Sequence, residues 1–198
     1  MTSPRAVDRG ELLRHAVEVF WRKGYGGTSV QDLVKALGLH RASLYETFRS
    51  KEDLFGEVVR RYSDLMFETV FEPLGGTSDL PPHASPRQRL AEFMEQAART
   101  LCEGEHHGCL VENAVLAHGG DLGRARGACL EHIERVENKL ADVIRSGQER
   151  GEFRADAPAH ELARIVRAAL SGMVFVSLVH RDPEALRPIR EGVLRALV

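Results

Sequence analysis

A short segment of the chain, residues 40–51, concentrates side chains that suit contacts with nucleic acid. The segment has helical spacing, and Leu44 and Phe48, four residues apart, are expected to face inward. The polar residues left on the outer face are His40, Arg41, Ser43, Tyr45 and Thr47. Arginine can pair with guanine in the major groove, and serine or threonine can contact a base or a phosphate. Ala42 keeps the helix narrow enough to approach base edges.

Two helix starts beside this segment suit phosphate binding. Lys51 follows Ser50, which is expected to cap a helix together with Asp53. The macrodipole disfavours a cation in a first helical turn by about 0.3–1 kcal/mol. A phosphate bound at that helix start would reverse the balance, because the free N–H groups and the lysine would both contact it. Thr28, at another helix start, can add its hydroxyl in the same way.

The elements that position these side chains are short helices. An apolar repeat after Asp8 predicts a first helix that stops at Gly24. Thr28 and Gln31 form the pattern of a capping box for a second helix, which is expected to end at Gly38. The connection at Gly38-Leu39 is too short for an antiparallel hairpin. The sequence therefore predicts a helix-turn-helix whose second helix enters the major groove.

The rest of the chain also has helical periodicity and contains no convincing strand or repeat. After a helix over residues 50–72 comes a Gly-, Pro- and Ser-rich stretch, residues 75–86, that is typical of a loop. Further helices are expected at about residues 87–103, 109–118, 121–150, 157–180 and 183–197. An all-α protein of about nine helices is predicted.

The totals agree with an intracellular globular protein. The 198 residues carry a net charge of −2, which by itself argues against a general nucleic-acid binder. Residues 1–54, however, hold nine Lys or Arg against seven Asp or Glu, a positive excess of the sign expected for a DNA-binding domain. Three cysteines and the lack of an export signal predict a reduced, cytoplasmic protein. The most apolar stretch, residues 168–179, is shorter than the roughly 20 residues of a membrane span, so no membrane association is expected.

The segment from Thr28 to Phe55 resembles the DNA-binding domain of the TetR (tetracycline repressor) family. The matching residues are Thr28, Gly38, Leu44-Tyr45, Phe48, Ser50-Lys51-Glu52 and Leu54. The resemblance implies a three-helix DNA-binding domain over residues 1–54 and a helical-bundle domain for effector binding and dimerisation over residues 55–198. It also implies a non-enzymatic repressor without a cofactor. Such a protein binds a palindromic double-stranded operator as a homodimer and is released by a small-molecule effector.

The resemblance assigns roles to single residues. It implies phosphate contacts at Thr28, Tyr45 and Lys51. It implies base contacts at His40, Arg41, Ala42, Ser43 and Thr47. An effector pocket between the middle helices would be lined by Tyr62, Met66, Phe93, Met94, Cys109, Asn113 and Phe175.

Dimerisation is expected through the helix over residues 157–180, which becomes apolar on nearly every side. A helix of this kind must be covered on every side, and a partner subunit is a natural cover. The expected interface comprises Leu162, Val166, Leu170, Met173, Val174, Ile189 and Val193. The alternative is that this face is buried within one subunit.

The sequence leaves three other functions open. Cys109, close to His106 and His107, could make the regulator responsive to thiol oxidation or to a metal. Glu103 and His106 form half of a di-iron motif, but the sequence contains no second Glu-x-x-His. A helical enzyme is disfavoured because the sequence lacks catalytic pairs. An interaction module that no longer binds DNA would share the helices but lack operator affinity.

Overall fold

The computed structural model describes residues 8–75, 84–103 and 107–198. Over these residues the chain forms nine α-helices and three short 3-10 turns, without a strand. Their contacts divide into two compact units. The first unit contains the chain up to Asp64 together with Cys109–His132, and the second contains Leu65–Gly108 and Ile133–Val198. The expected all-α class is confirmed.

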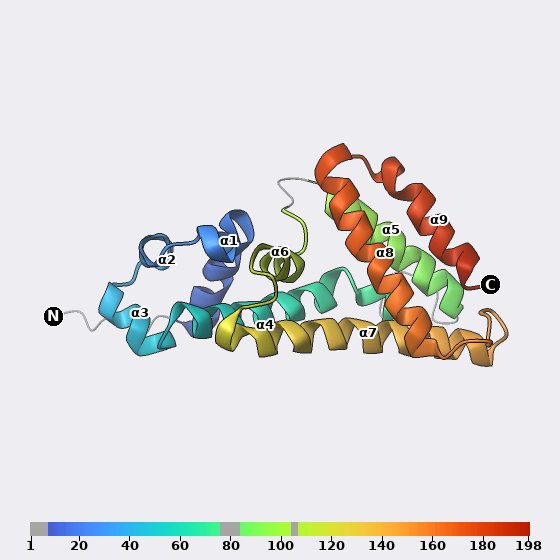
Figure 1. Cartoon of the computed structure of the whole chain (residues 1–198), viewed down its shortest axis with the longest axis horizontal. Coiled ribbons are helices and arrows are strands. Elements are labelled where there is room, and N and C mark those ends of the chain that lie inside the picture. The colour runs from blue at the N-terminus through green and yellow to red at the C-terminus, as the bar shows by residue number, and fades with distance from the viewer. Residues whose placement is uncertain (1–7, 76–83, 104–106) are drawn as a thin grey trace. The chain divides into compact units, whose positions relative to one another are not determined.

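The first unit is built on three N-terminal helices, shown in blue in Figure 1: α1 (Arg9–Gly27), α2 (Val30–Leu37) and α3 (Arg41–Phe48). The first part of α4 (Lys51–Thr69), all of α6 (Leu110–Ala117) and the start of α7 (Arg126–Glu149) complete it. Asp8 caps α1 by accepting a hydrogen bond from the Gly10 amide, and the helix breaks at Gly24, where φ is 70°. That break lies where the sequence predicts it.

The start of α2 differs from the expectation by one residue. Its capping box is formed by Ser29 and Asp32, and not by Thr28 and Gln31. The Lys23 ammonium, 2.5 Å from the Asp32 carboxylate, and the Ser29 cap hold the pKa of Asp32 well below its usual range. Thr28 is 1% exposed, and its hydroxyl donates to the Gly24 carbonyl at 2.7 Å. Thr28 therefore closes the break in α1, and the next residue caps α2.

The core of the first unit joins the helix-turn-helix to α1 and α4. Leu44 and Phe48 of α3 are buried, as their spacing predicts. Phe20 of α1 and Phe55 of α4 are fully buried, with ring centroids 5.0 Å apart. This packing presents the remaining face of α3 to solvent as a rigid surface, because large aromatic contacts fix the helices beneath it.

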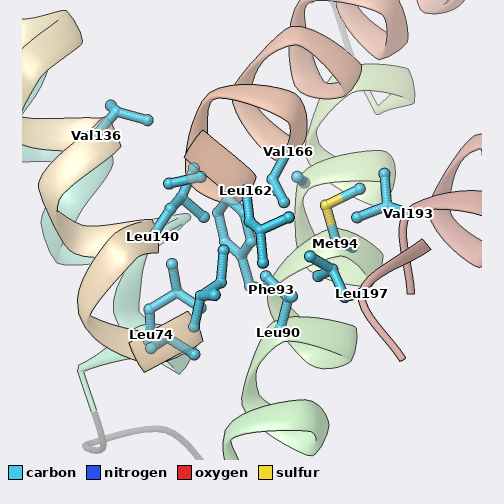
Figure 2. Close-up of a cluster of buried hydrophobic side chains, with 14 of the residues drawn as sticks. Leu74, Leu90, Phe93, Met94, Val136, Leu140, Leu162, Val166, Val193 and Leu197 are labelled. Carbon is cyan, nitrogen blue, oxygen red and sulfur yellow. The ribbon is translucent and has the colours of Figure 1, made fainter. Parts of the chain in front are cut away.

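The second unit packs α5 (Pro86–Cys102), α8 (Ala159–His180) and α9 (Arg187–Ala196) against one another, with the distal parts of α4 and α7. Figure 2 shows side chains from α5, α7, α8 and α9 that meet in its core. The short turns η1 (Glu72–Leu74) and η3 (Pro183–Leu186) close the unit, and η2 (Gly123–Ala125) leads into α7 in the first unit.

The structure corrects part of the expected dimer interface. Leu162, Val166 and Met173 of α8 are at most 1% exposed, and Val193 of α9 is also buried. These four residues belong to the core cluster of the second unit, together with Leu90, Phe93 and Met94 of α5. Figure 2 shows Leu162, Val166 and Val193 in this cluster. Leu170, Val174 and Ile189 are only partly buried. For the four buried residues, the alternative of burial within one subunit is correct.

Helix α8 also presents an exposed apolar face. The exposed fractions are 53% for Ile165, 71% for Phe175, 49% for Leu178 and 66% for Val179. The helix is apolar on two sides, and periodicity alone could not indicate which side faces α5 and α9.

Among the described helices, α8 is the one that by length and composition could cross a membrane, contrary to the expectation from residues 168–179. Its buried side packs in the core of the second unit. Arg167 of α8 donates to Glu137 of α7 at 2.7 Å. Core packing and ion pairing account for this helix as part of a folded domain.

Candidate nucleic-acid interface

The turn between α2 and α3 has the geometry of a helix-turn-helix. Helix α2 ends at Leu37, and Gly38 follows in the left-handed conformation with φ 64° and ψ 23°. Glycine adopts this conformation without the steric penalty of a side chain. His40 has an extended backbone and is the N-cap of α3, although its side chain makes no capping bond. The ring of His40 is therefore available at the exposed start of α3.

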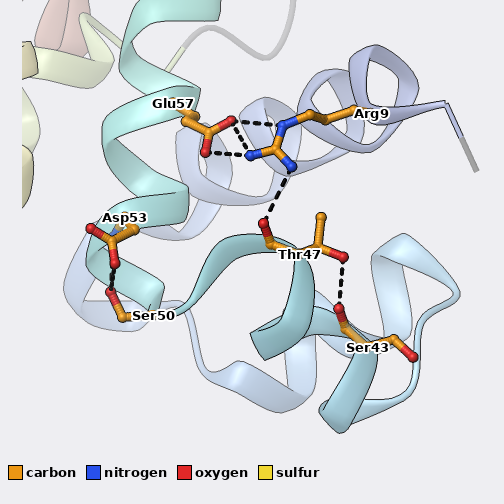
Figure 3. Close-up of polar contacts among 6 residues, drawn as sticks. All are labelled: Arg9, Ser43, Thr47, Ser50, Asp53 and Glu57. Carbon is orange, nitrogen blue, oxygen red and sulfur yellow. Dashed lines mark hydrogen bonds and ion pairs between the residues drawn. The ribbon is translucent and has the colours of Figure 1, made fainter.

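The outward face of α3 carries the residues expected to contact bases. His40, Arg41 and Ala42 are exposed, and Ser43 is half-buried. The Thr47 hydroxyl donates to the Ser43 carbonyl at 2.7 Å (Figure 3), so the lone pairs of its oxygen stay available as acceptors.

Tyr45 shares this surface. It is 37% exposed, and the Arg41 guanidinium lies 5.8 Å from its ring centroid. Helix α3 thus brings one cation, one phenol and several smaller polar groups together on one surface.

Arg9 fixes the far end of α3, a role that the sequence did not indicate. Its guanidinium forms a two-pronged ion pair with Glu57 of α4, with N–O distances of 2.6 and 3.1 Å. It also donates to the Thr47 carbonyl at 3.2 Å (Figure 3). The guanidinium carbon lies 4.8 Å from the centroid of the Phe48 ring. Arg9 therefore ties α1, α3 and α4 together. Its partners lie 38 and 48 residues away, so no local pattern could have revealed it.

The link between α3 and α4 is a strained turn at Arg49. Arg49 has φ 61° and ψ −51°, and the Ser50 amide donates to the Phe48 carbonyl at 2.6 Å. This is the rare γ-turn with positive φ, which costs a side-chain-bearing residue of order 1 kcal/mol or more. The turn directs the chain from the end of α3 into the cap of α4.

Replacing Arg49 with glycine should stabilise the protein. Glycine adopts positive φ without strain, so we expect Arg49→Gly to raise the free energy of unfolding by about 1 kcal/mol. Urea denaturation followed by circular dichroism measures this change. Glu46→Gly, at an exposed position inside α3, is the control and should destabilise by a similar amount. If Arg49→Gly lowers the free energy of unfolding, the Arg49 side chain stabilises the fold by more than the strain of the turn destabilises it.

The first turn of α4 holds Lys51 in a defined place. The Ser50 hydroxyl accepts from the Asp53 amide at 3.0 Å and donates to the Asp53 carboxylate at 2.9 Å, as the sequence predicts. The Lys51 ammonium lies 4.4 Å from the ring centroid of Tyr25, and partial burial lowers the pKa of Lys51. Thr28, the other residue expected at a helix start, is buried. The exposed residue at the start of α2 is Ser29, whose spacing to Asp32 fits a capping box as well as that of Thr28 to Gln31.

The residues expected to line an effector pocket are divided between the two units. Met66, Phe93 and Met94 belong to the second unit, where Phe93 and Met94 are fully buried and Met66 packs against the core. Phe175 also belongs to that unit, but 71% of it is exposed, so in the single chain it faces solvent and lines no interior. This outcome departs from the expectation for Phe175.

The other three expected pocket residues lie in the first unit. Tyr62 is 3% exposed and shares a hydrogen bond with Cys109, while Asn113 is half-buried on α6. Beside them, Nδ1 of the buried His132 lies 3.0 Å from the Ser63 hydroxyl oxygen, a pair that the sequence did not indicate. The Tyr62 and His132 ring centroids are 5.9 Å apart. The structure thus gathers several polar groups at one place inside the first unit.

The thiol and metal alternatives gain no support. Burial, with Glu112 nearby, raises the pKa of Cys109 to about 11, so the thiol is protonated near neutral pH. Burial also raises the pKa of Cys129 to about 11. Within the described residues no group of three His, Cys, Asp or Glu side chains could hold a metal ion. His106 lies outside those residues.

Two models of known protein families match this chain, one in its N-terminal part and one in its C-terminal part. The family model described as bacterial regulatory proteins, tetR family, matches residues 12–58. The model described as tetracyclin repressor-like, C-terminal domain, matches residues 86–193. The first match contains the helix-turn-helix, and the second contains the helices α5 to α8 and most of α9.

Relatives resemble the chain over nearly its full length. The repressor DhaR of a Mycobacterium species is 27% identical over 98% of this chain and 94% of its own length. The regulator YezE of Bacillus subtilis is 28% identical over 92% of both chains. A solved structure of a cysteine mutant of the regulator CifR with operator DNA has a TM-score of 0.81 and is 29% identical, covering 98% of this chain and 99% of that one. The two matching family models and these relatives show that the chain belongs to the TetR family of transcriptional regulators.

Proposed function

We propose that this regulator is a one-component repressor that binds a palindromic operator as a homodimer and leaves it when a small molecule binds. The observation that carries the proposal is the exposed polar face of α3, held in place by the buried Leu44 and Phe48. A helix presented in this way fits the major groove of B-form DNA. The proposal describes a cytoplasmic regulator that needs no cofactor and has no catalytic role.

The proposed DNA contacts divide into two kinds. His40, Arg41, Ala42, Ser43 and Thr47 face the base edges. Tyr45 and Lys51 contact phosphates. The amides at the start of α2 that its capping box leaves free contact a phosphate beside the buried Thr28. Phosphate contacts set the orientation on the duplex, while base contacts discriminate between sequences.

The exposed face of α8 supports the homodimer. Ile165, Phe175 and Val179 fall on one side of the helix and are more than half exposed. Between them lies Gly172, where an added Cβ would meet no atom within 4 Å. A contiguous apolar face with a small residue at its centre suits close packing against the same helix of a second copy. Two-fold symmetry would then present two α3 helices to two half-sites.

The effector is proposed to act on the polar groups around Tyr62, Cys109 and His132. Buried hydroxyl, thiol and imidazole groups among apolar side chains can orient a small polar ligand. A ligand that binds one arrangement of the DNA-binding helices better than another shifts the population away from the operator.

Operator binding by point variants tests the proposed function. We expect Lys51→Ala to weaken binding to all sequences and to lower the slope of log K against log salt by about 1 for each phosphate that the variant no longer neutralises. Arg41→Ala should instead relax specificity by about 1–3 kcal/mol at one base pair of each half-site. The measurement is a titration of DNA from upstream of the protein's own coding region at several salt concentrations.

Lys139→Ala, on α7 in the second unit, is the matched control and should leave both quantities unchanged. A wild-type protein without sequence-specific DNA binding would refute the proposal. So would equal behaviour of the Lys51, Arg41 and Lys139 variants.

A further inference from the structure

The ring of His118 is seated against the turn that follows the break in α1. His118 is the C-cap of α6, and its ring meets the Tyr25 ring edge-on with centroids 5.0 Å apart. Its Nε2 atom is buried and has no hydrogen-bond partner among the described residues. A Cβ at Gly26 would stand 3.2 Å from both Cε1 and Nε2 of His118. The turn is therefore shaped to accept this ring.

Tyr25 lies between His118 and Lys51. Its ring is held from the core side by Phe55, at 4.8 Å, and by Phe20, at 6.2 Å. The Lys51 ammonium stands over the same ring at 4.4 Å. Burial raises the pKa of Tyr25, and the nearby Glu52 adds to the effect. The ring is thus a fixed neutral surface on which the lysine side chain rests.

A second contact joins η2, which follows α6 along the chain, to the first turn of α4. Arg124 forms an ion pair with Asp53 at 3.0 Å. Gly123 has φ 50°, and a Cβ there would lie 2.8 Å from a carboxylate oxygen of Glu52. The residues that follow α6 therefore contact both Glu52 and Asp53, next to Lys51 along α4, while His118 supports the ring on which Lys51 rests.

We propose that His118 and Tyr25 are positioning residues for the phosphate contact of Lys51. Neither residue touches DNA in this proposal: His118 holds the Tyr25 ring, and the ring holds the lysine ammonium. The inference rests on the proposed function, because it takes Lys51 to be a phosphate-binding residue. It adds a direct route by which a displacement of α6 changes the strength of DNA binding.

The physical reason is the freedom of the lysine side chain. A lysine has four rotatable bonds, and ordering them on binding opposes affinity. Stacking on an aromatic ring restricts the ammonium before the phosphate arrives, so less freedom is given up when the complex forms. If α6 moves and His118 no longer contacts Tyr25, the Tyr25 ring loses this support. The Lys51 side chain then regains its rotational freedom.

The experiment compares operator binding by the full-length variants His118→Ala, Tyr25→Leu and Tyr25→Phe. A cation–π contact contributes about two- to five-fold in affinity, so a dimer with two such contacts should bind about four- to twenty-five-fold more weakly in Tyr25→Leu. His118→Ala should show a loss in the same direction. Tyr25→Phe keeps the ring and should bind DNA as the wild type does.

A double-mutant cycle with Lys51→Ala separates positioning from folding. If His118 acts through Lys51, then His118→Ala has little further effect in the Lys51→Ala background. Additive losses, or a lower melting temperature with unchanged affinity, would overturn the inference. Gly26→Ala is the second variant. Gly26 is exposed, and the added methyl group would press on the His118 ring without removing it, so this variant should also weaken DNA binding.

The controls distinguish failure of this inference from failure of the proposed function. If Lys51→Ala itself leaves operator affinity and its salt slope unchanged, the proposed phosphate contact is wrong. If Lys51→Ala weakens binding while Tyr25→Leu, His118→Ala and Gly26→Ala do not, the phosphate contact stands and the positioning role is wrong.

Discussion

Replacing Phe175 with glutamate is expected to make the protein a monomer and to weaken operator binding about 100-fold or more. Phe175 is 71% exposed on the apolar face of α8, and two-fold symmetry would place two copies of it in one interface. Burying two unpaired carboxylates there costs several kcal/mol, well within the range of interface hot spots. Analytical ultracentrifugation measures the association, and a titration with operator DNA measures the loss of affinity.

Leu116→Glu is the matched control, because Leu116 on α6 is 80% exposed. It should leave the dimer intact. Phe175→Glu proteins that sediment as dimers at micromolar concentration would contradict the proposed interface, and the effect of this change on DNA binding would then need another cause.

In contrast to Phe175→Glu, replacing Leu162 with alanine should greatly lower the stability of the fold and leave the dimer unchanged. Leu162 is 1% exposed and packs against α5 in the core of the second unit (Figure 2). Truncating a buried leucine leaves a cavity and lowers the free energy of unfolding by about 2–5 kcal/mol. Urea denaturation measures that loss.

Ile165→Ala, three residues further along α8, provides the comparison. Ile165 is 53% exposed, so its truncation should cost little stability in the single chain but weaken association. If Leu162→Ala shifted the dimer equilibrium while its unfolding free energy stayed unchanged, the assignment of Leu162 to the core would be wrong.

The helix-turn-helix could be predicted because its signals are local. Gly38 ends α2, and the Ser50–Asp53 pair caps α4. Each of these signals is contained in a few consecutive residues. The start of α2 shows the limit of such signals. Thr28 with Gln31 and Ser29 with Asp32 fit a capping box equally well, and the choice depends on whether the Thr28 hydroxyl is already bound to the Gly24 carbonyl.

The faces of α8 and the interior of the first unit could not be predicted from local patterns. Leu162 and Ile165 are both apolar residues of one helix, and only the packing of α5 and α9 decides which is buried. The contacts of His118 with Tyr25 and of Arg9 with Glu57 join residues far apart in the chain. Such pairs carry no signal in a single sequence.

The bond from Arg9 to α3 has a practical consequence for engineering. Arg9 holds the end of this helix through the main-chain carbonyl of Thr47, not through its side chain (Figure 3). Any residue at position 47 offers the same carbonyl, and the helix is otherwise anchored by Leu44 and Phe48. Under the proposed base contacts, the outward positions of α3 could therefore be exchanged as a set to change the DNA sequence that the protein binds, with α1, α2 and α4 left unchanged.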